Sequence, residues 1–264
     1  MISVVTYKGF SKTFCLQQVS SSTDWEAVDV KGACPAEAYN MALRHVRGEY
    51  VLFLDENERV NLSALEGVNK SLLDEDFLVF DFVCHYSDGR EELRMPNTYH
   101  VSVQALLRAT IVDDYPGQVS NILFKKTTLD TNEISFQSDL NSYMETFFFV
   151  SVLNHSKKYR YVNEPLMHCL LPQKWGTQEY TVNGYFSYCR YYRALTGILD
   201  KSDLKTIDNK VFEKKVCFME HTLLNTRNFN REIETPLAVF WSANWSLIRK
   251  LKYTGMFFFT KLVK

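Results

Sequence analysis

The first third of the chain alternates short, nearly continuous apolar runs with segments whose apolar residues have helical spacing. The runs ISVVT, WEAVDV, YVLFL and FLVFDFVCH predict strands over residues 2–6, 25–30, 50–54 and 77–85. Helical spacing covers residues 35–46, followed by Gly48, and residues 63–73. This alternation favours a parallel sheet with helices on both faces, in which ligands bind beyond the carboxyl ends of the strands.

The later part of the chain first continues this alternation and then becomes helical. Ser87-Asp88-Gly89-Arg90 predicts a hairpin-like turn after the fourth strand. Further strands are predicted over residues 119–125 and 159–162, and helices over residues 99–111, 140–153 and from 178 to the end.

Composition and charge exclude several classes of protein. With 264 residues, 46% of them hydrophobic, the chain can bury a sizeable core. A formal net charge of -1 argues against nucleic acid as a partner. None of the six cysteines forms a CxxC pair, which favours buried, reduced thiols in a cytoplasmic protein. Residues 1–5 are typical of a strand rather than a signal peptide, and no apolar run reaches the roughly 18 residues of a membrane span.

An acidic cluster, Asp55-Glu56-Asn57-Glu58, directly follows the most apolar of the predicted strands. Carboxylates in this position could hold a divalent cation, which would neutralise a diphosphate. The alternative is a solvated turn that caps the following helix.

Glu145 is a second candidate, because it is a lone acid among aromatic residues on a helix that otherwise has a buried composition. Burial would raise the pKa of its carboxyl group toward the range of a general base. The alternative is a surface position on an amphipathic helix. His168, near a strand end, is more often a structural residue than a ligand, and the other five histidines show no ligand spacing. The sequence has no GxSxG elbow, no P-loop, and no GxGxxG after the first strand.

Taken in order, several segments resemble the family-2 glycosyltransferases of GT-A fold, especially bacterial enzymes of surface polysaccharide and teichoic acid synthesis. The opening ISVVTY is similar to that family's first strand, and AYN followed by RGEYVLFLD is similar to its passage leading to a DxD motif. VSNILFKK, Ile134-x-Phe136 and Met144-Glu145-x-x-Phe148 have the order of the passage before the family's catalytic base, and YVNEPL resembles its sequel.

The resemblance implies a GT-A-type, Rossmann-like mixed sheet flanked by helices, in a catalytic domain over residues 1–172. Residues 173–264 would form a helical C-terminal region. Glu145 would be the catalytic base, and Asp55 and Asn57 would hold Mn2+ or Mg2+ on the nucleotide diphosphate. The positions that would bind the donor are Thr6, Tyr7, Asp29, Asn40 and Asp55.

The implied activity is inverting transfer of a sugar from a nucleotide-sugar, a UDP-sugar by resemblance, to a hydroxyl of a glycan or polyol-phosphate acceptor. The chain departs from the family pattern at three positions. Asn57 stands in place of the second Asp of the DxD motif, Glu145 in place of the Asp that is usually the catalytic base, and Met144 in place of the acidic residue before that base. Only about 20 residues separate Asp29 from Tyr50, an interval that is longer in the family. The alternative is therefore a non-catalytic subunit that binds or scaffolds an active glycosyltransferase.

The C-terminal segment, residues 241–264, mixes five basic residues with aromatic residues and leucines, and contains no acid. This composition is typical of a segment in a membrane interface, which would place the protein peripherally on an anionic cytoplasmic leaflet. The alternatives are a helix packed on the catalytic domain and a contact surface for another copy or a different chain.

Overall fold

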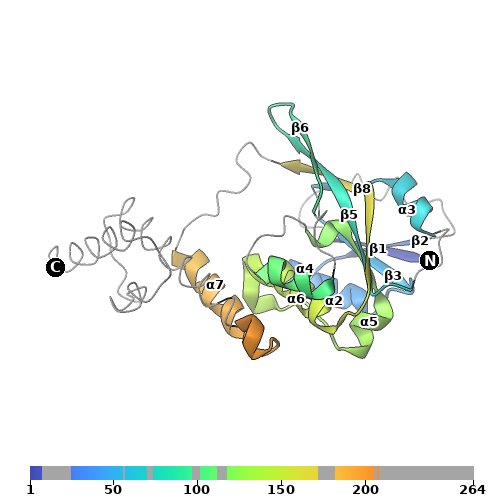
Figure 1. Cartoon of the computed structure of the whole chain (residues 1–264). Coiled ribbons are helices and arrows are strands. Elements are labelled where there is room, and N and C mark those ends of the chain that lie inside the picture. Colours follow the sequence, from blue (N-terminus) through green and yellow to red (C-terminus); the bar gives the residue numbers. More distant parts are fainter. Residues whose placement is uncertain are drawn as a thin grey trace.

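The computed structural model describes residues 1–7, 25–55, 57–69, 74–96, 102–111, 118–171, 182–204 and 207. Its centre is an eight-stranded sheet in the order β2-β1-β3-β7-β5-β8-β4, with β6 paired to β5 (Figure 1). The strands are β1 (Ile2–Tyr7), β2 (Trp25–Val30), β3 (Tyr50–Leu54), β4 (Glu58–Val60), β5 (Phe77–Tyr86), β6 (Glu91–Arg94), β7 (Ile122–Lys125) and β8 (Tyr159–Leu171).

The sheet is mixed, as the resemblance implied. β1 pairs in parallel with β2 and β3, and β5 pairs in parallel with β8. β7 is antiparallel to both β3 and β5, so β5 runs in the same direction as β3. The four strands predicted in the first third of the chain therefore run in one direction, as expected, but β7, from later in the chain, inserts antiparallel between β3 and β5. β4 and β6, which the sequence analysis did not predict as strands, pair antiparallel with β8 and β5.

The helices lie on both faces of the sheet (Figure 1). They are α2 (Pro35–Leu43), α3 (Leu62–Asn69), α4 (Val103–Ile111), α5 (Lys126–Thr131), α6 (Met144–His155) and α7 (Val182–Leu195), with short 3-10 helices η1 (Val119–Asn121) and η2 (Ser138–Tyr143). Core residues of α2, α4, α6 and α7 pack with Val5, Val51 and Phe53 on one face. Core residues of α3 pack with Val4, Leu52 and Leu54 on the other face.

The Phe-rich segment predicted as a helix over 140–153 divides into η2 and α6. Eight of the twelve side chains of α6 are buried, among them all those from Phe147 to Leu153, which explains why its sequence shows no polar stripe. Phe148 stacks on Phe136 with 3.9 Å between ring centroids and meets Phe53 of β3 edge-on at 5.7 Å. These ring contacts hold the first turn of α6 beside the end of β3.

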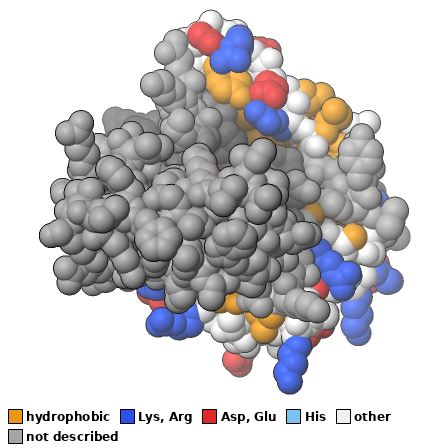
Figure 2. Space-filling view, turned by 60° about the vertical axis from the view of Figure 1, so that its left-hand side comes forward, with side chains coloured by type: hydrophobic (Ala, Val, Ile, Leu, Met, Phe, Trp, Pro, Cys, Tyr) orange, Lys and Arg blue, Asp and Glu red, His pale blue; other side chains and the backbone are white. Residues whose placement is uncertain are grey.

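β8 is much longer than the predicted strand over 159–162. Pro165, which cannot donate a backbone hydrogen bond, pairs with Asp81 where the β5–β8 register shifts. The strand therefore continues beyond the proline, and β5, β6 and β8 extend out of the sheet as an arm (Figure 1). Side chains of both charge signs and apolar side chains are interspersed at the top of Figure 2, at the height of this arm.

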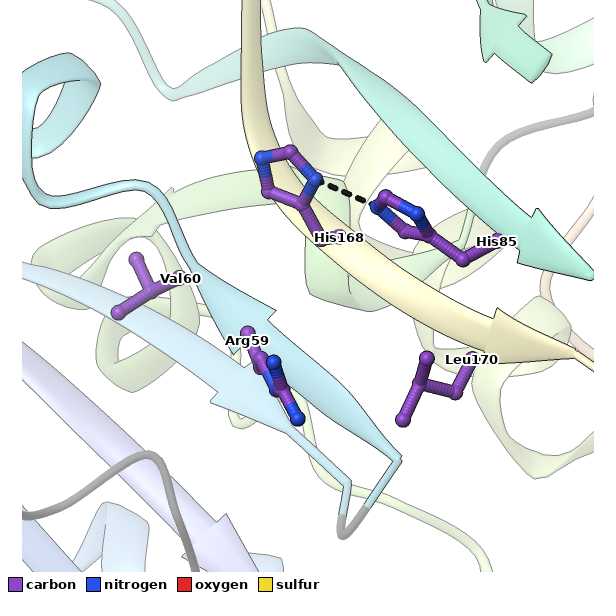
Figure 3. A pocket seen from close by; sticks show the side chains of 5 residues that line it. All are labelled: Arg59, Val60, His85, His168 and Leu170. Carbon is purple, nitrogen blue, oxygen red and sulfur yellow. Dashed lines mark hydrogen bonds between the residues drawn. The ribbon is translucent and has the colours of Figure 1, made fainter. Parts of the chain in front are cut away.

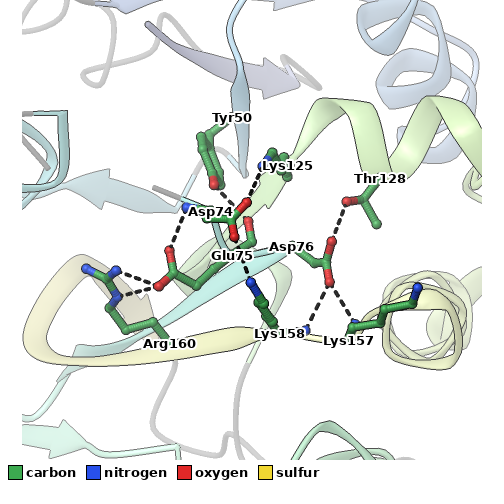
Figure 4. A network of polar contacts seen from close by, with 9 residues as sticks. All are labelled: Tyr50, Asp74, Glu75, Asp76, Lys125, Thr128, Lys157, Lys158 and Arg160. Atoms are coloured by element: carbon green, nitrogen blue, oxygen red, sulfur yellow. Dashed lines mark hydrogen bonds and ion pairs between the residues drawn. The ribbon is translucent and has the colours of Figure 1, made fainter. Parts of the chain in front are cut away.

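A polar network fixes the opposite end of the sheet, where β5 and β8 begin (Figure 4). The Asp76 carboxylate accepts the backbone N–H groups of Lys157 and Lys158 at 2.7 and 3.0 Å. The Glu75 carboxylate accepts Arg160 Nε at 2.9 Å. This network ties the start of β5 to the start of β8.

Candidate functional site

Asp55 is the first residue after β3, whose five residues are all buried. In the strand register, Thr6 of β1 lies between Leu54 of β3 and Asp29 of β2. The carboxyl ends of three parallel strands therefore meet at Asp55, as predicted for a ligand edge.

Strand alternation separates the predicted donor residues into two groups. Val5 and Phe53 contribute to the α2/α6 core, so the alternating positions Tyr7 and Asp55 point to that face as well. Thr6 alternates with them and points to the opposite face, as does its register partner Asp29. Tyr7 packs against Tyr39 of α2, with ring centroids 6.3 Å apart.

Glu145 lies in the first turn of α6 and is half-buried. Burial, together with the nearby negative charge of Asp55, raises its pKa to about 7. The two acids that the sequence singled out, 90 residues apart, are thus electrostatic neighbours at one site. The Glu145 side chain is half-buried rather than fully exposed, and its role as a base stays a prediction.

Glu58 is a third acid of this cluster, and sequence reasoning missed its position. It was expected in an exposed acidic loop, but it is the first residue of β4 and is only 6% exposed. Its carboxylate accepts the Ser120 hydroxyl at 2.5 Å and the Asp55 backbone N–H at 2.8 Å. Burial and the charge of Asp55 raise the pKa of Glu58 well above its usual value. No pattern in a three-residue strand would have revealed this burial.

Tyr39 of α2 lies within range of the charges of all three acids, Asp55, Glu58 and Glu145. Its side chain is buried, and its hydroxyl donates to the Leu54 carbonyl at 3.4 Å. Burial raises the pKa of Tyr39 well above its usual value, and the charges of Glu145, Glu58 and Asp55 add to that effect. The three acids therefore gather in a poorly solvated region, where burial and mutual repulsion favour the protonated forms of Glu58 and Glu145. A bound divalent cation would favour their ionised forms.

Asn57 is exposed, and its backbone N–H donates to Asp55 Oδ1 at 2.6 Å. Within the described ranges, no group of three or more His, Cys, Asp or Glu side chains is placed to hold a metal ion. Asp55 and Asn57 supply a carboxylate and an amide oxygen, which suit Mg2+ or Mn2+ when a diphosphate supplies further oxygens. Glu56 lies outside the described residues.

Two other predicted donor residues have distinct surroundings. Asn40 of α2 donates its amide to the Phe136 carbonyl and accepts the Phe136 N–H, both at 2.8 Å. Its amide therefore fixes the loop that carries Phe136. The Thr6 hydroxyl is buried without a hydrogen-bond partner among the residues that the structure describes. Their roles toward a donor stay predictions.

The cysteines and the predicted C-terminal region are only partly described. Cys84 and Cys169 are buried free thiols whose sulfur atoms are 3.4 Å apart, while Cys34 and Cys189 are half-buried. In the part of the chain that the structure describes, no helix is long and apolar enough to cross a membrane. The basic aromatic segment over residues 241–264 lies outside it.

Comparison with solved structures shows which fold this site belongs to. The chain superposes on S. aureus TarS 1–349 in complex with UDP-GlcNAc with a TM-score of 0.60 at 14% identity, covering 85% of this chain and 76% of that one. The UDP complex of the same TarS fragment gives a TM-score of 0.54 at 14% identity, over 90% and 76% of the two chains. TarS itself gives 0.56 at 14% identity, over 85% and 45%. No protein-family model and no curated protein matches the chain. The chain has the GT-A glycosyltransferase fold.

Proposed function

We propose that the chain is an inverting glycosyltransferase that moves a sugar from a nucleotide-sugar to an acceptor hydroxyl. The proposal rests chiefly on one observation, the proximity of Asp55 and Glu145 at the carboxyl end of β3. The shared fold and the UDP-GlcNAc complex of TarS 1–349 support a UDP-sugar as donor. A glycan or a polyol-phosphate polymer is the proposed acceptor.

Glu145 is the proposed general base. A pKa of about 7 leaves a large fraction of its carboxyl groups ionised near neutral pH, while they remain basic enough to accept a proton. The acceptor oxygen forms a bond to the anomeric carbon as the bond from that carbon to the diphosphate oxygen breaks. The acceptor proton moves to Glu145, and single displacement inverts the configuration.

Asp55 and Asn57 are the proposed ligands of a divalent cation, which when bound would stabilise the negative charge of the leaving diphosphate. Glu58 is a positioning residue in this account. Its carboxylate accepts the Asp55 N–H at 2.8 Å and so fixes the backbone from which the Asp55 side chain projects. Tyr7, which packs on Tyr39 beside Asp55, is the proposed wall of the nucleobase site.

Thermal unfolding in the presence of nucleotides tests this proposal against the non-catalytic alternative. UDP and UDP-sugars with Mn2+ should stabilise the protein, by about 2.7 kcal/mol when the free ligand concentration is about 100 times its Kd. A degenerate subunit with no functional donor site would show no stabilisation by any nucleotide-sugar, with or without the metal.

Peripheral membrane association and the division at residue 172 are further parts of the proposal. The basic aromatic segment over residues 241–264 supports the first, because each basic residue near an anionic leaflet contributes about 1 kcal/mol. Co-sedimentation with anionic but not neutral vesicles, lost on deletion of residues 241–264, is the expected result. Equal binding by the full and truncated chains would leave packing on this or another chain as the role of the segment.

A further inference from the structure

A cavity of about 300 Å³ lies where β4 meets the arm, and it is lined by Arg59 and Val60 of β4, His85 of β5, and His168 and Leu170 of β8 (Figure 3). Sequence analysis assigned no function to His85 and found no ligand spacing between the histidines. The structure nevertheless places His85 and His168 side by side on neighbouring strands, with stacked rings inclined by 27° whose centroids are 5.1 Å apart.

This cavity is separate from the acid cluster. In the β4–β8 register, Arg59 pairs with His168 and Glu58 pairs with Cys169. Because neighbouring residues of a strand point to opposite faces, Arg59 and His168 face away from the side on which Glu58 meets Asp55. Glu58 is buried, whereas Arg59 is exposed. A ligand in this cavity would therefore be distinct from one bound at the acid cluster.

Hydrogen bonding among the described residues leaves one ring nitrogen of the histidine pair for that ligand. His85 Nε2 lies 2.9 Å from His168 Nδ1 (Figure 3). On the other side of the ring, His85 Nδ1 lies 3.1 Å from Glu91 Oε1. Three of the four ring nitrogens are thus engaged in a chain from Glu91 through His85 to His168. The fourth, Nε2 of His168, is left to contact a molecule in the cavity.

The electrostatics of the cavity favour an anion over a metal ion. Arg59 carries a permanent positive charge on the lining, which would repel a cation. The two engaged nitrogens already face each other at hydrogen-bond distance, so they do not both point at a common metal position. A volume of about 300 Å³ matches the lower end of small-molecule sites and can take an oxyanion with a small organic group.

We propose that this cavity is a binding site for a phosphate group, held by the Arg59 guanidinium and by Nε2–H of His168. Binding takes up one proton. In the resulting state His85 is an imidazolium whose Nδ1–H donates to Glu91 and whose Nε2–H donates to His168 Nδ1. His168 is neutral and carries its proton on Nε2, which donates to a phosphate oxygen.

The direction of the pH dependence follows from the groups around His168, which are His85 of β5, Glu91 of β6 and Arg59 of β4. In the empty cavity, burial lowers the pKa of His168, and His85 and Arg59 add to that effect while Glu91 opposes it. Burial therefore favours the neutral form of His168 in the empty cavity, and a bound anion favours protonation of the pair. Affinity should rise as the pH falls, with uptake of one proton per anion.

Calorimetric titration of the full chain with inorganic phosphate, glycerol 3-phosphate and sulfate tests this site. Sulfate stays a dianion between about pH 6 and about pH 8, so the pH dependence of its binding reports the histidine pair alone. Sulfate should bind about tenfold more tightly at the lower pH. Tighter binding of glycerol 3-phosphate than of inorganic phosphate identifies an ester as the ligand, and equal binding identifies the free anion.

Arg59→Gln and His168→Gln should each weaken phosphate binding about tenfold or more, because each removes a charge-assisted hydrogen bond. Arg90→Gln is the matched control, an exposed arginine of the same arm that pairs with Asp88, and it should leave affinity unchanged. Arg59 is exposed, so its variant should fold even where the His168 variant does not. Failure of phosphate to bind, insensitivity to Arg59→Gln, or binding of Zn2+ alone in a His168-dependent manner would each overturn the proposal.

Discussion

Asp55, at the end of β3, and Glu145, in the first turn of α6, lie close enough that the charge of the first raises the pKa of the second. The pKa of Tyr39 of α2 is raised by burial and by the charges of both acids and of Glu58. Because the stacked rings of Phe136 and Phe148 fix α6 against β3, this proximity is built into the core. It places a candidate base beside a candidate cation ligand, which is the arrangement that the proposed reaction requires.

Replacing Glu145 by Gln should keep donor binding and lower turnover by about 100-fold or more, since the amide preserves shape but cannot accept the proton. In the wild type, only the ionised carboxylate is active, so kcat should rise with pH through an apparent pKa of about 7. Steady-state rates across this range check both points. Glu66→Gln, at an exposed acid of α3, is the control. Near-normal kcat in the Glu145→Gln variant would exclude Glu145 as the base.

The same substitution should stabilise the protein in a pH-dependent way. The folded-state pKa of Glu145 is raised from 4.5 to about 7, so ionisation favours the unfolded chain as the pH rises between these values. The stability difference between Glu145→Gln and wild type should therefore be larger at about pH 8 than at about pH 5, by at most about 2.5 kcal/mol of unfolding free energy. Urea unfolding at both pH values measures this difference. If Glu145→Gln changed the unfolding free energy by the same amount at both pH values, Glu145 would have no raised pKa in the folded protein.

Gly48 is required by a close approach between the turn before β3 and the start of β1. A Cβ atom there would lie 2.5 Å from both the backbone nitrogen and the hydroxyl oxygen of Ser3. Gly48→Ala should therefore destabilise the fold by about 2 kcal/mol or more. Gly67→Ala is the matched control, because nothing lies within 4 Å of a Cβ on this glycine of α3. In a helix, that change should stabilise by about 0.5–1 kcal/mol. Similar unfolding midpoints for the two variants would refute the steric account.

Asn40→Ala separates a structural role from a donor-binding role. Both halves of the Asn40 amide bond the Phe136 backbone, so the variant should lose about 2 kcal/mol of unfolding free energy. Donor affinity should change less than on removal of the Asp55 charge. Met41→Ala, at an exposed position of the same helix, controls for helix effects. Unchanged stability with lost donor binding would instead assign Asn40 to the donor.

The sequence predicted the strand over 50–54 without error, because five consecutive buried residues leave an apolar run that no surface element shows. It also marked Asp55 and Glu145, but not their proximity, since that depends on how α6 packs against β3. Glu58 was missed because its burial comes from partners distant in sequence, among them Ser120. An acid in an acidic run carries no local sign of such burial.

The arm was missed for a related reason. The predicted strand ended at Val162, yet the register shift at Asp81 lets β8 continue past Pro165. The pairing of His85 with His168 depends on that continuation, so the 83-residue separation between them hid their contact. Propensity and periodicity report local preference, whereas this contact is set by strand order in the sheet.

Calorimetric titration of the wild type and of Asp55→Asn with UDP-GlcNAc in the presence of Mn2+ tests the central claim most directly. The Asp55→Asn variant keeps an oxygen for the Asn57 N–H, which Asp55 Oδ1 accepts at 2.6 Å, and removes only the charge. Asp139→Asn, at an exposed acid of η2, is the control. We predict Mn2+-dependent binding by the wild type and the control, weakened about tenfold or more in Asp55→Asn with little change in unfolding midpoint. Equal donor affinity of wild type and Asp55→Asn would contradict the account.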